Sequence, residues 1–119
     1  MGSCSMRLRA LATAAACGLA VLFAAAPSAS AAEGEFTYVY NDPTGAPHLG
    51  ALADPPSGVC LTLAEVADPW TAPAHSPRNN TTSTTTVFTG PDCEGDRFTL
   101  RPQGGHASER LKLRSVVFS

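Results

Sequence analysis

The sequence predicts a small all-β domain with one disulfide, preceded by a signal peptide and a tethered N-terminal strand. Proline and glycine are frequent, with ten of each among the 119 residues. The apolar stretches after the leader are short, and several alternate with polar residues, which is the period of a strand. No segment of useful length has the helical period. Together these observations favour short strands separated by turns.

Residues 1–31 have the features of a signal peptide. Arg7 and Arg9 supply positive charge, and the stretch around and after them is almost wholly apolar. Pro27 ends this stretch, and Ala29-Ser30-Ala31 is the small-residue pattern that a signal peptidase reads. A membrane-spanning helix needs about 20 uninterrupted apolar residues, more than this leader offers. We therefore expect cleavage after Ala31, no membrane span and an extracellular protein.

Loss of the leader changes the cysteine count from four to two. Cys17 follows three alanines, as at a lipidation site, but the branched residue three positions before it is missing and the apolar run continues past it. We therefore expect Cys4 and Cys17 to leave with the leader. Cys60 and Cys93 are expected to form one disulfide in an oxidising compartment. Closing a loop of this length stabilises a chain by roughly 3–4 kcal/mol in the chain-entropy description.

The mature chain is acidic. Six of the eight basic residues lie after the leader, against ten acidic residues, so its net charge is near −4. After the leader, six acidic residues precede the first basic residue, and most basic residues lie in the last quarter of the chain. We do not expect nucleic acid as a partner, because binding it needs a dominant basic face. The cationic tail is expected to be either a solvated strand face or a docking surface for an acidic partner.

The first predicted strand is 36–40, in which Phe36, Tyr38 and Tyr40 share one face. Residues 43–58 follow with four prolines and three glycines, and we interpret 32–57 as one strand on a Pro/Gly-rich tether. A tethered strand can pair with the edge of another protein. The three aromatic residues are therefore predicted to contact a partner. The alternative is that the strand completes its own sheet.

The compact domain is predicted to span 58–119. We expect its strands, in order, at 59–63, 79–89, 97–101 and 111–118, with one short turn around Trp70. In the last two strands the side chains expected to face the core are Phe98, Leu100, Leu111 and Leu113. Lys112 and Arg114 are expected to face solvent.

Three segments of this domain carry a resemblance. They are Gly58-Val59-Cys60-Leu61-Thr62-Leu63, Phe88-Thr89-Gly90-Pro91-Asp92-Cys93-Glu94-Gly95 and Leu113-Arg114-Ser115-Val116-Val117-Phe118. They resemble small secreted actinobacterial proteins related to the βγ-crystallin Greek key, among them killer-toxin-like and inhibitor proteins. The resemblance implies a small Greek-key sandwich, in which an aromatic residue and a glycine mark a folded hairpin and a serine begins a later strand. The full motif, with two aromatic residues framing the glycine, is incomplete here.

Crystallin-like domains often bind calcium through paired Asn or Asp residues followed by Ser or Thr. The segment 79–84 has that outline, but it lacks the carboxylates that calcium favours. Before Ser115, where the family ligands would lie, the sequence has Arg110 and Leu111 instead. We therefore expect no calcium and no other metal.

Catalytic motifs are missing from the sequence. His48, His75 and His106 lie in predicted loops without metal-ligand spacing, and no serine stands in a nucleophile motif. Cys60 and Cys93 lack the C-x-x-C spacing of a redox pair. The sequence therefore predicts a protein without cofactor that is not an enzyme.

Three functions follow as hypotheses. The first is a non-catalytic protein-binding adaptor. Its size, leader and layout resemble the adaptor subunit of umbrella toxin particles, which would imply linking a lectin-bearing subunit to a toxin stalk. The second is a free-standing antimicrobial, killer-toxin-like protein, against which the negative charge of the mature chain argues. The third is a protease inhibitor that presents the loop Ala46-Pro47-His48-Leu49 to an enzyme cleft.

Overall fold

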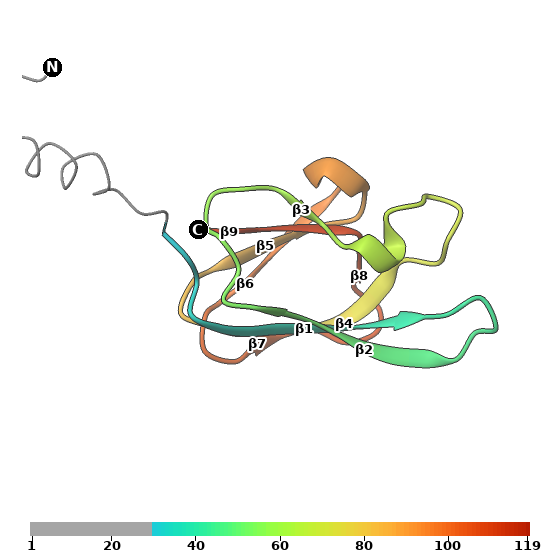
Figure 1. The fold of residues 1–119 in the computed structure, drawn as a ribbon, viewed down its shortest axis with the longest axis horizontal. Coiled ribbons are helices and arrows are strands. Elements are labelled where there is room, and N and C mark those ends of the chain that lie inside the picture. The colour runs from blue at the N-terminus through green and yellow to red at the C-terminus, as the bar shows by residue number, and fades with distance from the viewer. Residues whose placement is uncertain (1–29) are drawn as a thin grey trace, which may run out of the picture.

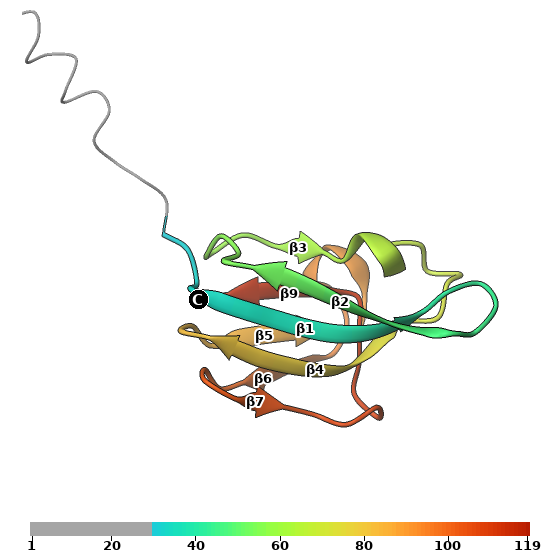
Figure 2. The same ribbon diagram turned by 60° about the horizontal axis from the view of Figure 1, so that its bottom comes forward.

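The computed structural model of the chain describes residues 30–119. The predicted signal peptide, with Arg7, Arg9, Cys4 and Cys17, lies outside the described residues except for its last two positions. The described part is all-β, with two antiparallel sheets packed face to face (Figures 1 and 2). The strands are β1 Gly34–Asn41, β2 Pro47–Ala53, β3 Leu61–Thr62, β4 Ala74–Thr81, β5 Thr85–Phe88, β6 Arg97–Leu100, β7 Gly105–His106, β8 Lys112–Leu113 and β9 Ser115–Phe118. Two short 3₁₀ turns, η2 Ala64–Val66 and η3 Pro91–Cys93, interrupt the connections.

The two sheets exchange strands. The first sheet has the order β2-β1-β4-β7, with β8 also pairing to β4, and the second has the order β3-β9-β5-β6. Thus β3, from the first half of the chain, lies in the second sheet. Strands β7 and β8, from the second half of the chain, lie in the first sheet. Because β1, in residues 32–57, pairs with β4, in residues 58–119, these two parts cannot be separated without breaking the first sheet.

The core lies between the sheets and is built from aromatic and aliphatic side chains. Phe36 of β1 meets Phe118 of β9 edge to face, with 5.6 Å between ring centroids, and so joins the two sheets. The large buried side chains are Phe36, Tyr38, Leu63, Val66, Val87, Leu113, Val116 and Phe118. The alternation seen in 36–40 therefore marks the inner face of a core strand.

The prediction that residues 32–57 form one strand on a tether is wrong. Strand β1 is hydrogen-bonded to β2 on one side and to β4 on the other, and β2 occupies the middle of the Pro/Gly-rich segment. Gly50, which pairs with Tyr38, is buried beneath that tyrosine ring, where a Cβ atom would collide with ring carbons. This glycine permits close packing rather than flexibility. The strand Phe36–Tyr40 completes its own sheet, as the alternative interpretation held.

Strand limits and facing differ from the sequence expectations in several places. The segment 79–89 is two strands, because β4 starts at Ala74 and the chain turns at 82–84 before β5. The predicted last strand is split into β8 and β9. Phe98 is 45% exposed although it was expected in the core, since β6 is the edge of its sheet. Leu100 and Leu113 are buried and Lys112 is exposed, as predicted, and Leu111 is half-buried.

The Cys60–Cys93 disulfide is confirmed. It joins the segment before β3 to η3, in the loop 89–96 that connects β5 to β6. Ser115, buried at the start of β9, holds the same loop: its hydroxyl donates to the Gly90 carbonyl at 2.6 Å and accepts from the Cys93 backbone N–H at 2.8 Å. The loop is therefore folded against the second sheet.

Candidate binding site

One end of the molecule carries a cleft between two loops. The β1–β2 hairpin projects beyond the sandwich, and the loop after η2 lies beside it (Figures 1 and 2). The cleft between them has a volume of about 560 Å³. Its lining residues are Asn41, Asp42, Pro43, Gly45, Trp70, Thr71 and Ala72.

The hairpin tip is fixed by the Asp42 carboxylate. One carboxylate oxygen accepts from the Thr44 backbone N–H at 2.9 Å, the Thr44 hydroxyl at 2.6 Å and the Ala46 N–H at 3.0 Å. The other lies 2.9 Å from His48 Nε2. These hydrogen bonds, those from the Thr44 and His48 side chains first, hold the pKa of Asp42 well below its ordinary value of 3.8. An ionised Asp42 thus organises the turn through hydrogen bonds to residues of the turn itself.

Two further contacts complete the tip. The Asn41 side-chain amide donates to the Gly45 carbonyl at 2.9 Å. Gly45 has φ +89°, a left-handed conformation that glycine adopts without strain. The Tyr40 and His48 rings stack across the hairpin, with 5.5 Å between centroids. The first wall of the cleft is therefore preorganised.

Arg114 organises the second wall. Its guanidinium donates four hydrogen bonds to backbone carbonyls: to Val66 at 3.0 Å, Asp68 at 2.9 Å, Pro69 at 3.2 Å and Thr71 at 2.6 Å. The expectation that Arg114 faces solvent is therefore wrong. The loop it holds has no sheet partner for these carbonyls, and the five donors of a guanidinium suit such a cluster.

Trp70 stands on this ordered loop with 93% of its surface exposed. It is the one tryptophan of the sequence. Its backbone N–H donates to Asp68 Oδ1 at 2.9 Å, so the residue is positioned while its ring faces water. Sequence reasoning interpreted this segment as a turn only. The available signal was a lone tryptophan bounded by Pro69 and Pro73.

The predicted partner-binding aromatic residues are placed differently. Phe36 and Tyr38 are buried between the sheets, so as contact residues they are wrong. The Tyr38 hydroxyl donates to Glu65 Oε1 at 2.7 Å, and burial, together with this carboxylate, raises the pKa of the phenol. Tyr40 is half-buried against His48 and is the one of the three with surface at the hairpin.

The residues of the calcium outline serve the fold. The Asn79 amide nitrogen donates to the carbonyls of Ser83, Leu100 and Arg101, and its oxygen accepts from Thr81. Asn79 is buried, and its bonds fix the turn between β4 and β5. Its side chain is thus engaged with the protein itself.

The three histidines lie apart and have local partners. His48 contacts Asp42, while His75 Nδ1 lies 2.8 Å from the Ser76 hydroxyl and His106 Nδ1 lies 3.0 Å from the Gly104 carbonyl. In residues 30–119 no group of three His, Cys, Asp or Glu side chains is placed to hold a metal ion. None of the helical segments in that range is long and apolar enough to cross a membrane.

Comparison with known proteins gives no relative: no protein-family model, curated protein or solved structure matches the chain. The function is therefore argued from the geometry of the cleft and its surroundings.

Proposed function

We propose that the chain is a secreted, non-catalytic protein-binding module, and that the cleft beside Trp70 is its contact surface. The observation that carries the proposal is the 93% exposure of Trp70 on a loop held by Arg114 and Asp68. Tryptophan is enriched among the residues that dominate binding energy at protein interfaces. An aromatic side chain on a preorganised loop also loses little conformational freedom on binding.

The fold, we further propose, is a crystallin-like double Greek key. The exchange of β3 and β7 between the sheets supports this, as does the folded loop that Ser115 ties to β9. From the resemblance in sequence we also propose a role for the protein: it is an adaptor that links subunits of an extracellular antibacterial toxin complex. On this proposal the docking element is the hairpin tip with Trp70, in place of a free N-terminal strand.

Affinity purification from culture supernatant tests the proposal. The tagged mature protein is compared with Trp70→Ala and with Val59→Ala, a matched change at an exposed apolar residue outside the cleft. We expect one co-purifying protein to be recovered with the wild type and with Val59→Ala, and to be lost with Trp70→Ala. Recovery of the protein alone would contradict an adaptor role, and equal recovery with all three would contradict the site.

A protease inhibitor is the second candidate, and the hairpin tip favours it. Ala46, Pro47, His48 and Leu49 are all exposed, and hydrogen bonds to Asp42 hold the turn that presents them. A rigid exposed segment can occupy an enzyme cleft without a large loss of entropy. Inhibition of a protease panel, with the segment uncleaved, would support this candidate. Growth inhibition by the purified protein alone would instead favour the killer-toxin-like alternative.

A further inference from the structure

Strand β6 is one edge of the second sheet, and β3 is the other. It pairs with β5 on one side, and within residues 30–119 no strand pairs with its other side. The chain continues into β7, but β7 joins the first sheet through β4. The outer N–H and C=O groups of an edge strand are a template for an added strand. The second sheet therefore offers a place for an extended segment of another molecule.

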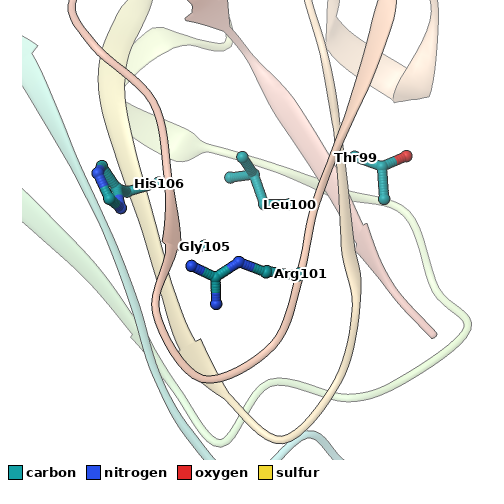
Figure 3. A pocket seen from close by; sticks show the side chains of 5 residues that line it. All are labelled: Thr99, Leu100, Arg101, Gly105 and His106. Atoms are coloured by element: carbon teal, nitrogen blue, oxygen red, sulfur yellow. The ribbon is translucent and has the colours of Figure 1, made fainter.

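Hollows border this edge at both of its ends. Phe98 lies in one, of about 340 Å³, which is lined by Thr89, Phe98, Ser108, Arg110, Leu111 and Lys112. The other, of about 290 Å³, is lined by Thr99, Leu100, Arg101, Gly105 and His106. Figure 3 shows the Arg101 side chain reaching from the end of β6 toward Gly105, with His106 and Thr99 to either side. An added strand would find room for side chains at each end.

Positive charge gathers around the same edge. Four exposed cations surround it: Arg97, Arg101, Arg110 and Lys112. Within residues 30–119 the one ion pair is that of Asp42 with His48, so none of the four has a carboxylate within 4.0 Å. Asp96 and Glu109, their sequence neighbours, are exposed, and neither carboxylate lies within 4.0 Å of any of the four cations. The cations stand out on a mature chain whose net charge is near −4.

We propose that β6 binds an extended acidic segment of a partner protein as an additional strand. Backbone hydrogen bonds would come from Arg97–Leu100, an apolar side chain would cover Phe98, and carboxylates would meet the surrounding cations. Charge complementarity selects an acidic peptide as the occupant. The site shares no lining residue with the Trp70 cleft. The molecule would thus have two separate contact surfaces, as a protein that connects two others requires.

Peptide titration tests the proposal with the mature protein. The probe is a fluorescein-labelled peptide of alternating glutamate and valine, and its control replaces each glutamate with lysine. We expect the acidic peptide to bind, less tightly as salt is raised. The double variant Arg97→Glu with Arg110→Glu should weaken binding by about tenfold or more. Arg78→Glu, an exposed cation on the first sheet, should leave it nearly unchanged.

Amide hydrogen exchange supplies the structural readout. Bound peptide should slow exchange at the outward-facing amides of β6 and leave exchange unchanged in β2, an edge of the first sheet. Equal binding of the acidic and basic peptides, no binding of either, or protection confined to other strands would overturn the proposal. So would self-association of the protein, or tighter binding of anionic vesicles or nucleic acid. Trp70→Ala should bind the acidic peptide normally, so failure of one site is distinguishable from failure of the other.

Discussion

The two hairpins that open the two halves of the chain are stabilised in opposite ways. The tip between β1 and β2 is held by residues inside the tip: Asp42 contacts Thr44, Ala46 and His48. The loop between β5 and β6 is held by residues far away in the sequence, through Ser115 and the Cys60 disulfide. Local bonding leaves the first tip projecting into water. Distant anchors fold the second loop onto the sheet.

This difference separates stability from binding. A loop anchored to the core stabilises the fold, but part of its surface is then covered by the sheet and cannot contact a partner. A tip that satisfies its own hydrogen bonds can project, and its neighbour Trp70 stays exposed because Arg114 orders the loop beneath it. We infer that substitutions in the second hairpin lower the free energy of unfolding, while substitutions around the first hairpin lower the affinity for the proposed protein partner.

Removal of the disulfide is expected to have the largest effect. The double variant Cys60→Ser with Cys93→Ser releases a loop closed across 33 positions and should lose roughly 3–4 kcal/mol of unfolding free energy. Urea denaturation followed by circular dichroism measures the loss. Wild-type protein treated with a reducing agent should match the variant. A loss below about 1 kcal/mol would mean that the hydrogen bonds of Ser115 and Thr62 hold the second loop without the disulfide.

Ser115→Ala should have the next largest effect. The substitution removes the hydroxyl that bonds the Gly90 carbonyl and the Cys93 N–H, and it leaves both groups without that partner. Both groups are partly buried, and losing two hydrogen bonds of about 0.5–1.5 kcal/mol each should cost about 1–3 kcal/mol. Urea midpoints measure the change, and Ser119→Ala at the exposed C-terminus is the control. An unchanged midpoint would show that the disulfide suffices.

Acid should weaken the first hairpin and spare the second. The folded pKa of Asp42 is lowered, so its stabilising contribution is present above its ordinary value of 3.8 and is lost as pH falls below that value. The protection of residues 42–48 from amide exchange, relative to the unfolded chain at the same pH, should fall over this range, while residues 89–96 remain protected. In Asp42→Asn, residues 42–48 should lack this protection at every pH. Equal acid sensitivity in both hairpins would remove the distinction between them.

Local patterns in the sequence predicted the first strand and the disulfide. Alternation in 36–40 identified a strand, and the count of cysteines left after the leader identified Cys60 and Cys93 as partners. The role of Gly50 needed a contact with Tyr38 across two strands, so composition alone suggested a flexible linker. A glycine that permits packing and a glycine that permits flexibility look the same in a sequence.

The candidate site depended on distant contacts and was therefore missed. Arg114 bonds to carbonyls that lie more than 40 positions earlier, which no local pattern encodes. Phe98 alternates as a core residue would, yet its strand became an edge once the sheet order was set. Trp70 had no pattern around it, and its exposure follows from the loop that Arg114 orders.

Trp70→Ala should have the smallest effect on stability. The ring makes few contacts at 93% exposure, so unfolding free energy should change by no more than about 0.5 kcal/mol. Arg114→Lys is the informative companion: a lysine cannot supply the forked donors, so the loop should loosen while Trp70 is retained. If both variants lose the partner and only Arg114→Lys loses stability, the loop is a preorganised support for the binding residue. If Trp70→Ala destabilises the protein as much as Ser115→Ala does, Trp70 contributes to the stability of the fold. The distinction between a region that binds and a region that stabilises would then be wrong.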